Sequence, residues 1–297
     1  MIRDFRAEDA AGVAAVLAET QPEYLNTERG VLHRFHHSPE RAQNRWLVAE
    51  EDGAVVAYAE SGLEWHLASG EVAGLWVGVS EQQRGRGLGS ELYRLAEEHA
   101  VSLGVRRLKT WAVDERFPSK RGFEVTSREQ LWEIDPRTFD APSASPADLR
   151  SLGEVRDRAE ELYEMYIAIE STMPREEQWT GYSFEEWRVD TLEFPDLDDE
   201  TSIVALVDGR LAASALLLVA PDDSFAEVEV TGTLPEFRRR GLARACKVES
   251  MRRAGERGIP RLVTDNDVTN EPMLALNRSL GFQPRGTLFE FTKQVGG

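Results

Sequence analysis

The sequence is poor in three features that would each indicate a particular class of protein. It contains one cysteine, Cys246, so no disulfide can form within the chain, and it gives no indication of a metal site. Its longest apolar run, LAASALLLVA at 211–220, has about half the length of a membrane-spanning helix. The first residues, MIRDFRAEDA, lack the apolar segment of a secretory signal peptide. We therefore expect a cytoplasmic protein that does not bind a membrane.

Positive charge is also scarce. The chain has 35 lysine and arginine residues against 53 acidic residues, a net charge of −18. Nucleic acids and anionic membranes bind a basic face that replaces their counterions, so neither partner is expected. The 297 residues, with 41% hydrophobic side chains and seven tryptophans, are sufficient for two folded domains of ordinary size.

The sequence repeats itself. QRGRGLGS at 83–90 returns as FRRRGLAR at 237–244, each after a strand-like run and before a helical one. Asp-Gly hairpin signals precede both loops, at 52–53 and 208–209. A repeat of about 150 residues is too long for a solenoid unit and indicates two copies of one domain. We predict domains at 1–140 and 141–297, joined within the Pro-, Ser- and Ala-rich stretch at 135–149.

The order of elements is the same in both copies. A short strand leads to helices, among them 11–19 and 155–169, and then to a hairpin. The third strand, 73–79 or 226–233, precedes the arginine–glycine loop and its helix, and another strand begins at 107 or 261. This predicts an α/β fold class with two domains, each a mostly antiparallel mixed sheet flanked by helices.

The arginine–glycine loop can be interpreted as a site that binds an anion. Glycines let the backbone curl tightly and let a ligand approach without meeting a Cβ atom. The unpaired N–H groups of the helix's first turn then converge on one spot, which suits a phosphate or pyrophosphate. The alternative is an arginine-rich surface turn. Recurrence at a strand-to-helix junction in both copies favours the anion site.

At this point the residues resemble a known family. The glycine-rich pattern ending in Arg-Gly-Leu-Gly, with a helix after it, resembles motif A of the GNAT superfamily of acetyl-CoA-dependent N-acyltransferases. TGTLPEFRRRGLARACK at 231–247 and TDNDVTNEPMLALNRSLGF at 264–282 are also similar to GNAT signatures. The resemblance covers essentially the whole chain as a tandem pair.

The resemblance implies a coenzyme A site in each copy. The loop amides would hold the pyrophosphate, and the strand before the loop would pair with the pantetheine arm through its backbone. The implied coenzyme residues of copy one are Val77, Val79, Arg84, Gly85, Arg86, Gly87, Leu88, Gly89 and Ser90. Those of copy two are Thr231, Thr233, Arg238, Arg239, Arg240, Gly241, Leu242, Ala243, Arg244, Asn270 and Asn277.

Acyl transfer to an amine also needs a base. An alkyl amine has a pKa near 10.4 and must lose a proton before it attacks a thioester. Many GNAT enzymes use a glutamate on the strand before the loop, which implies Glu227 in copy two, with Glu229 as the second candidate. Copy one has Ala73 at the corresponding position. The alternative is that both glutamates are solvated charges on a strand face.

Two departures from the family pattern distinguish the copies. Many GNAT proteins have a tyrosine near the end of the last helix, which protonates the leaving thiolate, and Asn277 stands at that position. In copy one the same helix is shortened and contains Pro118. We therefore expect that copy two is the catalytic copy and that copy one binds coenzyme A weakly or has only a supporting role.

The segment at 171–194 is rich in aromatic and acidic residues, and the resemblance places it beside the acceptor. Trp179, Tyr182 and Trp187, near Glu176 and Glu177, could hold an amine by cation–π and charge contacts. The alternative is that these aromatics pack the two domains together. A histidine cluster at positions 33, 36 and 37 fits an ordinary surface, a pocket wall or, least well, a metal.

These observations predict an N-acetyltransferase. It would move an acetyl group from acetyl-CoA to a primary amine of a small molecule, by direct attack in a ternary complex and without a metal. The alternatives are a non-catalytic acyl-CoA-binding or regulatory module and a protein lysine acetyltransferase. Either a monomer or a homodimer is compatible with the tandem arrangement.

Overall fold

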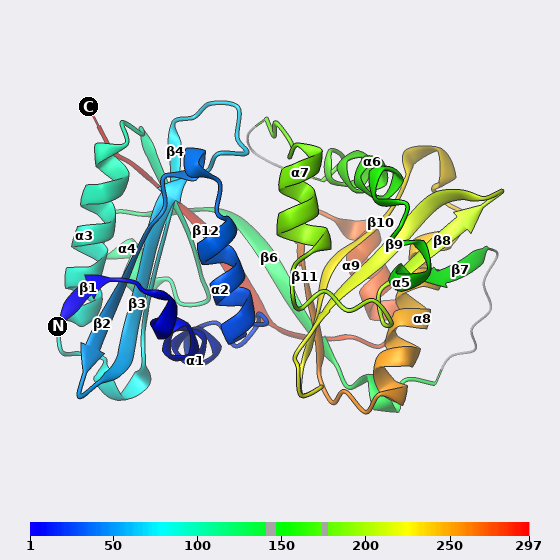
Figure 1. The fold of residues 1–297 in the computed structure, drawn as a ribbon, viewed down its shortest axis with the longest axis horizontal. Helices are drawn as coiled ribbons and strands as arrows, with labels where there is room; N and C mark the ends of the chain where they lie inside the picture. The colour runs from blue at the N-terminus through cyan, green and yellow to red at the C-terminus, as the bar shows by residue number, and fades with distance from the viewer. Residues whose placement is uncertain (141–146, 174–177, 297) are drawn as a thin grey trace. The chain divides into compact units, whose positions relative to one another are not determined.

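The computed structural model describes residues 1–140, 147–173 and 178–296 (Figure 1). These residues form two compact units. Unit 1 holds 1–129, 178–180 and 287–296, and unit 2 holds 130–140, 147–173 and 181–286. Each unit is a mixed sheet with helices against it, so the expected α/β fold class is confirmed.

Unit 1 is built around six strands in the order β1-β2-β3-β4-β5-β12. Neighbouring strands are antiparallel except for the parallel pair β4 and β5. The strands from the first part of the chain are β1 (Ile2–Asp4), β2 (Arg45–Glu51), β3 (Ala54–Leu63), β4 (Val72–Val79) and β5 (Arg107–Ala112). The helices are η1 (Ala7–Asp9), α1 (Ala10–Thr20), α2 (Glu28–His37), η2 (Glu40–Ala42), η3 (Glu81–Gln83), α3 (Leu88–Ser102) and α4 (Arg116–Ser119).

Unit 2 repeats this plan in the order β11-β10-β9-β8-β7, with β10 and β11 parallel. Its strands are β7 (Asp148–Ser151), β8 (Ile203–Val207), β9 (Arg210–Val219), β10 (Ala226–Thr233) and β11 (Leu262–Asp267). Its longer helices are α6 (Ala159–Glu170), α8 (Leu242–Glu256) and α9 (Glu271–Ser279). Its shorter helices are η4 (Pro136–Thr138), α5 (Leu152–Val155), α7 (Phe184–Trp187), η5 (Arg188–Leu192) and η6 (Pro235–Phe237).

The remaining strands, β6 (Glu124–Ile134) and β12 (Gln283–Gln294), are exchanged between the two sequence copies. The last strand of the chain, β12, pairs antiparallel with β5 of unit 1, from Phe289 opposite Ala112 to Gln294 opposite Arg107 (Figure 1). The last strand of copy one, β6, neighbours β11 of unit 2 in the sheet order. The sheet of each unit is therefore completed by a strand from the other sequence copy. The predicted domain boundary between residues 140 and 141 divides the two sequence copies and stays a prediction.

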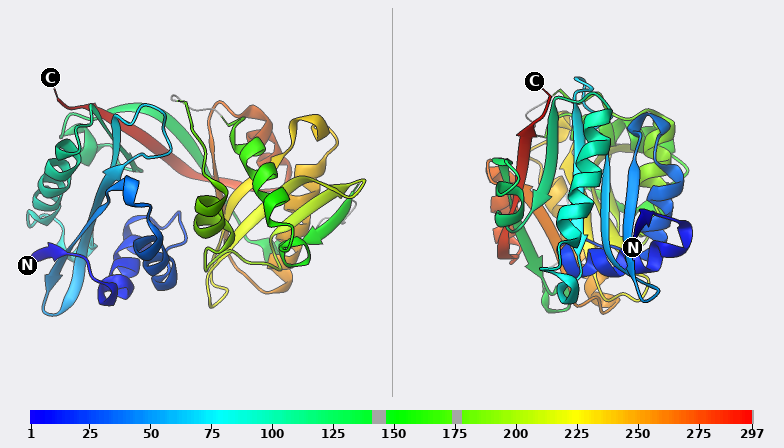
Figure 2. Two further views of the ribbon diagram at one scale, coloured as in Figure 1. Left: turned by 45° about the horizontal axis from the view of Figure 1, so that its top comes forward. Right: turned by 90° about the vertical axis from the view of Figure 1, so that its left-hand side faces the viewer.

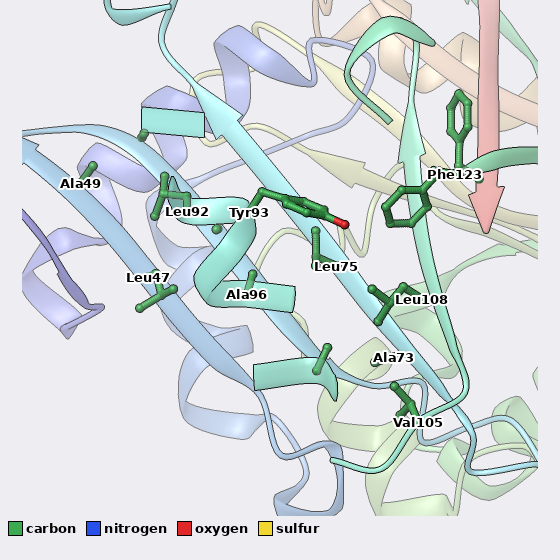
Figure 3. Packing of buried hydrophobic residues seen from close by; sticks show 14 residues of the cluster. Leu47, Ala49, Ala73, Leu75, Leu92, Tyr93, Ala96, Val105, Leu108 and Phe123 are labelled. Carbon is green, nitrogen blue, oxygen red and sulfur yellow. The ribbon is translucent and has the colours of Figure 1, made fainter. Parts of the chain in front are cut away.

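Helix α3 covers one face of the unit 1 strands, as the right-hand view of Figure 2 shows. Leu92 and Ala96 of the helix pack against Leu47, Leu75 and Leu108 of the sheet (Figure 3). Phe291 of β12 is fully buried in this same cluster, so the exchanged strand is part of the core. The opposite face is packed by α1 and α2 through a second cluster of buried residues.

Gly255 in helix α8 gives a test of this packing in unit 2. A Cβ atom added there would lie 2.4 Å from the backbone oxygen of Pro136 in η4. Alanine normally stabilises a helix interior relative to glycine, but backbone cannot move aside as a flexible side chain can. We expect Gly255→Ala to lower the free energy of unfolding by about 1–3 kcal/mol, measured by urea denaturation.

The matched control is Gly153→Ala in α5. There the nearest atom, Asp199 Cβ, lies at 3.4 Å, an ordinary contact distance. That variant should keep its stability or gain up to about 1 kcal/mol. Equal free energies of unfolding for the two variants would contradict the packing of α8 against η4.

Candidate functional site

The central feature of each unit is a pair of parallel strands that part from each other. In unit 2 the pairing of β10 with β11 places Ala226 opposite Leu262 and Glu227 opposite Val263, and the described pairing ends there. Both strands nevertheless continue for several residues. In unit 1 β4 and β5 pair only from Val72 to Gly74. Backbone groups along each gap are therefore available to a ligand that lies between the strands.

The loop after β10 has the conformation that an anion site requires. Arg239 and Gly241 have φ angles of 61° and 78°, and in unit 1 Gly85 and Gly87 have 77° and 90°. Alternation of this kind turns successive N–H groups toward one point. Arg239 adopts the left-handed conformation without being glycine, a strained state that tends to occur at functional sites.

The helices that follow the two loops lack a capping side chain. The N-cap residues of α3 and α8 are Gly87 and Gly241, and neither helix has a side-chain cap hydrogen bond. By contrast, Thr27 caps α2 and Asn270 caps α9. The first-turn N–H groups of α3 and α8 therefore have no capping side chain to accept their hydrogen bonds, as an anion site requires.

Glu229 lies at the start of the gap in unit 2, at a β-bulge. Val228 is opposite Leu217 of β9 and Val230 is opposite Leu216, so Glu229 is the extra residue between them. The side chain remains accessible to solvent, but protein surrounds the carboxyl closely enough that desolvation raises its pKa to about 7. The charges of three nearby carboxylates contribute to the same shift, those of Asp190, Glu170 and Asp265.

The other candidate base, Glu227, is half-buried and lies where β10 and β11 are still paired. Glu229 lies two residues further on, where the strands part. The charge of Glu229 also helps to raise the pKa of Tyr166, after the larger effect of burial. Because Tyr166 and Glu170 both belong to α6, Glu229 faces the α6 side of the sheet.

A buried polar chain occupies the α8 side of the same gap. Lys247 of α8 is only 1% exposed and donates a hydrogen bond from Nζ to Asn277 Oδ1 at 2.7 Å. Asn277, itself fully buried, donates from Nδ2 to Asn266 Oδ1 on β11 at 2.6 Å. Burial lowers the pKa of Lys247 to about 7, against the opposing charge of Asp265.

Three observations show that unit 2 fits a coenzyme A thioester. Thr231 of β10 has a buried Oγ1 atom that finds no hydrogen-bond partner among the described residues. A Cβ atom added at Gly241 would meet nothing within 4 Å, so the space beside the loop is open. Arg239 and Arg240 have no acidic partner within the described chain, which leaves their charges available to a pyrophosphate.

Unit 1 has the same loop, but its charges and its first helical turn are already engaged. Arg86 forms an ion pair with Glu51 at 2.9 Å. Arg121 donates to Ser90 Oγ at 2.8 Å, and its guanidinium lies 3.4 Å from the centroid of the Phe117 ring. Phe117 belongs to α4, which has four residues where α9 has nine, so the expected shortening of this helix is confirmed.

The other residues expected to bind the coenzyme lie on the strands and loops beside the gaps. Val77 and Val79 lie on β4 beyond its pairing with β5, and Thr233 ends β10. Arg84 and Arg238 donate from Nε to the carbonyl oxygens of Val79 and Thr233, so each closes its own loop. The other loop positions, Leu88, Gly89, Leu242, Ala243 and Arg244, form the first turns of α3 and α8.

The three aromatic residues expected beside the acceptor are divided between the two units, and Tyr182 and Trp187 both contact Tyr163 of α6. Trp179 belongs to unit 1, where it forms a β-bridge with Leu67. Trp187 is 2% exposed and packs within unit 2 against Tyr163, at 5.6 Å between ring centroids. Tyr182 accepts a hydrogen bond at its backbone oxygen from Tyr163 Oη. Glu176 and Glu177 lie outside the described residues.

Sequence reasoning missed four charged residues of this site: Glu170, Asp190, Lys247 and Asp265. Three of them face Glu229 from separate elements, α6, η5 and β11, and no local pattern links those positions. Lys247 carried a signal, because it lies four residues before Met251 and so on the apolar side of its predicted helix.

The fold and the site define a tandem acyltransferase architecture, with two parted sheets and two uncapped helices after glycine-containing loops. The sequence pattern described as the Acetyltransferase (GNAT) family matches residues 13–123 and 159–282. The chain therefore belongs to the GNAT family of acetyltransferases and is an N-acetyltransferase, as the resemblance implied.

Two similar proteins are named mycothiol acetyltransferases. The chain is 26% identical to the one from Thermobifida fusca, over 93% of this chain and 87% of the relative. It is 28% identical to the one from Thermomonospora curvata, over 81% and 79% of the two chains. Both alignments extend over most of the tandem pair.

Solved structures share the fold. A tandem GNAT protein from the clavulanic acid biosynthesis pathway has a TM-score of 0.73 and 17% identity, covering 100% of this chain and 99% of the other. A GCN5-related N-acetyltransferase from Sphaerobacter thermophilus has a TM-score of 0.69 and 19% identity, covering 99% and 95%. At these identities the likeness supports the fold alone.

The described residues also lack two other kinds of feature. None of their helices is long and apolar enough to cross a membrane. They also contain no group of three histidine, cysteine or acidic side chains that could hold a metal ion. His33 and His37 stack on each other, with ring centroids 4.5 Å apart.

The loop of unit 2 can be tested with Gly241→Ala. At a φ of 78° an alanine is strained by about 1–2 kcal/mol, and its Cβ atom would project into the open space beside the loop. We expect the Kd for acetyl-CoA to rise at least about tenfold, because the pyrophosphate can no longer approach the backbone. Calorimetric titration measures this.

Gly209→Ala is the matched control. Gly209 has a φ of 79°, also with nothing within 4 Å, but it lies in the hairpin turn before β9. Both variants should unfold at similar temperatures, and only Gly241→Ala should weaken binding. Equal Kd values for the two would show that the loop does not carry the coenzyme.

Proposed function

We propose that unit 2 transfers an acetyl group from acetyl-CoA to a primary amine of a small molecule, by direct attack in a ternary complex. The observation that carries the proposal is the position of Glu229. Its carboxyl lies at the start of the strand gap, and its surroundings hold its pKa at about 7. A base with a pKa near the working pH is well suited to remove a proton from an ammonium group.

The carboxylates around Glu229 suit a cationic acceptor. Glu170, Asp190 and Asp265 contribute negative charge at the mouth of the gap, where a protonated amine is attracted. Loss of its proton to Glu229 makes the amine nucleophilic. The nitrogen lone pair then attacks the thioester carbonyl, and the C–S bond breaks as the amide forms. The second nitrogen proton passes to the leaving sulfur, directly or through solvent, and coenzyme A departs as the thiol.

The coenzyme would lie along the α8 side of the gap. Residues 238–244 would hold the pyrophosphate through their N–H groups and the charges of Arg239 and Arg240. Thr231 would donate or accept a hydrogen bond from its orphaned Oγ1 atom, and the backbone of β10 up to Thr233 would pair with the pantetheine amides. When bound, acetyl-CoA supplies the activated acetyl group.

The acceptor is a small molecule on two grounds. The relatives from Thermobifida fusca and Thermomonospora curvata carry the name of a small-molecule acetyltransferase. Three carboxylates act electrostatically on the one group, Glu229, which favours a compact cation as the acceptor. We propose a cytoplasmic enzyme, monomeric or homodimeric, that needs no metal.

Unit 1 would have a different role, as a coenzyme site that binds weakly or not at all. The ion pair of Arg86 with Glu51 neutralises the loop charge, and Phe117 and Arg121 lie against the first turn of α3. Binding there must break these contacts. The tandem pair would then contain one catalytic and one supporting unit.

Glu229→Gln tests the base. The carboxyl must be ionised to accept a proton, so the wild-type kcat/KM should rise with pH through about 7. In Glu229→Gln this rise with pH should be absent, and kcat/KM should be lower by about 10²–10⁴-fold. Steady-state assays over a panel of small primary amines measure both. Glu227→Gln is the paired variant, and if it removes the rise instead, Glu227 is the base.

Glu229→Gln should lower the activity of the enzyme but raise its stability at alkaline pH. The pKa of Glu229 is raised in the folded state, so the folded protein binds this proton more tightly than the unfolded chain does. Stability is therefore lost as the pH rises through about 7. Glu229→Gln should raise the Tm at pH 8 and leave it unchanged near pH 4.

A calorimetric titration with acetyl-CoA separates the two units. We expect one tight site per chain, removed by changing Arg240 and Gly241 but not by changing Arg86 and Gly87. Two sites of similar affinity would contradict the supporting role of unit 1. An absence of binding would contradict the function proposed for the whole chain.

A further inference from the structure

Two carboxylates stand opposite each other where the strands of unit 2 part. The last residues that pair are Glu227 of β10 and Val263 of β11. Two residues further along each strand lie Glu229 and Asp265. Because β10 and β11 run parallel, equal steps from the last pair bring these two side chains to the same level, one on each side of the gap.

Both carboxylates lie on the same face of the sheet. Leu262 of β11 packs in a buried cluster with Met251 of α8, so the alternation along the strand directs Asp265 to the opposite face, toward α6. Glu229 faces α6 as well, since its charge acts on Tyr166 of that helix. Desolvation is the main cause of the raised pKa of Glu229, and the charge of Asp265 adds to it.

The two carboxylates are accessible and uncompensated. Asp265 is half-buried and Glu229 is exposed, and neither forms a hydrogen bond or an ion pair with another described residue. Lys247 acts on Asp265 electrostatically, but its Nζ atom is buried and donates to Asn277 Oδ1 at 2.7 Å. Two like charges that face each other across a gap repel, so this arrangement favours a cationic ligand.

The repeat shows that the fold does not require these charges. When the two arginine–glycine loops are aligned, Asp265 corresponds to Trp111 of unit 1, and Glu229 corresponds to Leu75. The strands β4 and β5 part in unit 1 without a carboxylate at either position. The carboxylate pair is therefore specific to the unit whose loop arginines are free of acidic partners among the described residues.

We propose that the acceptor of unit 2 is a diamine, which reacts at Glu229 and is held through a second, non-reacting ammonium by Asp265. This rests on the acetyl transfer proposed above. Glu229 takes a proton from the reacting nitrogen, which becomes neutral and loses its attraction to carboxylates. Asp265 stays ionised and keeps the second ammonium in place during the transfer. The product then leaves with one amide and one remaining positive charge.

The spacing of the strands favours a short, flexible chain between the two nitrogens. Paired strands lie about 4.8 Å apart, and β10 and β11 separate beyond their last pair. A carboxylate on each strand can therefore bind one end of the same small molecule by a charge-assisted hydrogen bond. A monoamine of equal length would leave Asp265 without a cation.

The test compares two matched amines, 1,4-diaminobutane and butylamine, as acceptors for the full chain with acetyl-CoA. We expect the wild type to have a kcat/KM at least about tenfold higher for the diamine, because only the diamine gains the charged contact. Asp265→Asn keeps the shape of the side chain and removes its charge. It should abolish this preference by raising the KM for the diamine, and it should leave kcat/KM for butylamine unchanged.

The control variant is Asp52→Asn, which removes one negative charge at an exposed hairpin turn of unit 1. Asp52 has a φ of 51°, a conformation that asparagine also tolerates. This variant should retain the wild-type preference for the diamine. Calorimetric titration with 1,4-diaminobutane measures binding without turnover, and the Kd should be at least about tenfold higher for Asp265→Asn than for the wild type. Thermal unfolding confirms that each variant is folded.

The outcomes separate this inference from the proposed function. If the wild type acetylates both amines with equal kcat/KM, the diamine is wrong and the acetyl transfer stands, a comparison that needs no variant. If Asp265→Asn lowers kcat/KM equally for both amines, Asp265 acts only through Glu229 and the diamine is again wrong. If neither amine is acetylated but diamine binding depends on Asp265, the ligand is upheld and the proposed acetyl transfer fails.

Discussion

The parting of two parallel strands is the constraint on which the rest of each unit depends. Parallel strands normally satisfy each other along their whole length, and β10 and β11 stop doing so after Glu227 and Val263. The bulge at Glu229 accompanies this change, since the extra residue bends β10 where the pairing ends. Unpaired backbone is costly when buried, so the gap is stable only if something polar lines it. The hydrogen-bonded chain of Lys247, Asn277 and Asn266 reaches β11 beyond its last pairing with β10, and the carboxylate of Glu229 lies where that pairing ends.

The two units show how one plan can diverge in electrostatics while its backbone stays the same. The loops have matching φ angles and both helices lack a capping side chain. The two loops differ in the partners of their arginines. Arg86 of unit 1 forms an ion pair with Glu51, whereas Arg240 of unit 2 lies over the Phe237 ring and has no acidic partner among the described residues. Backbone geometry therefore specifies a class of ligand, while nearby charges decide which copy is available to it.

The fold could be predicted from the sequence because its signals are local and occur twice. Hairpin turns at Asp52 and Asp208, and glycines at the loop ends, each specify a conformation that the structure confirms. The strand exchange could not be predicted, since β6 and β12 have the same alternating pattern and each would fit either sheet. The charges around Glu229 were also missed, because burial and the convergence of α6, η5 and β11 exist only in the folded chain. Trp187, expected beside the acceptor, is buried against Tyr166 of α6, and its role there stays a prediction.

The exchanged strand β12 has a consequence for synthesis and for evolution. Until β12 has been synthesised, β5 of unit 1 presents an open edge that can pair wrongly. Unit 1 therefore cannot complete its sheet until most of unit 2 has been synthesised. Once two copies share strands in this way, neither can be lost by a simple truncation, because the survivor would lack an inner strand. Each copy is thus an obligatory part of its partner's fold, whether or not it catalyses.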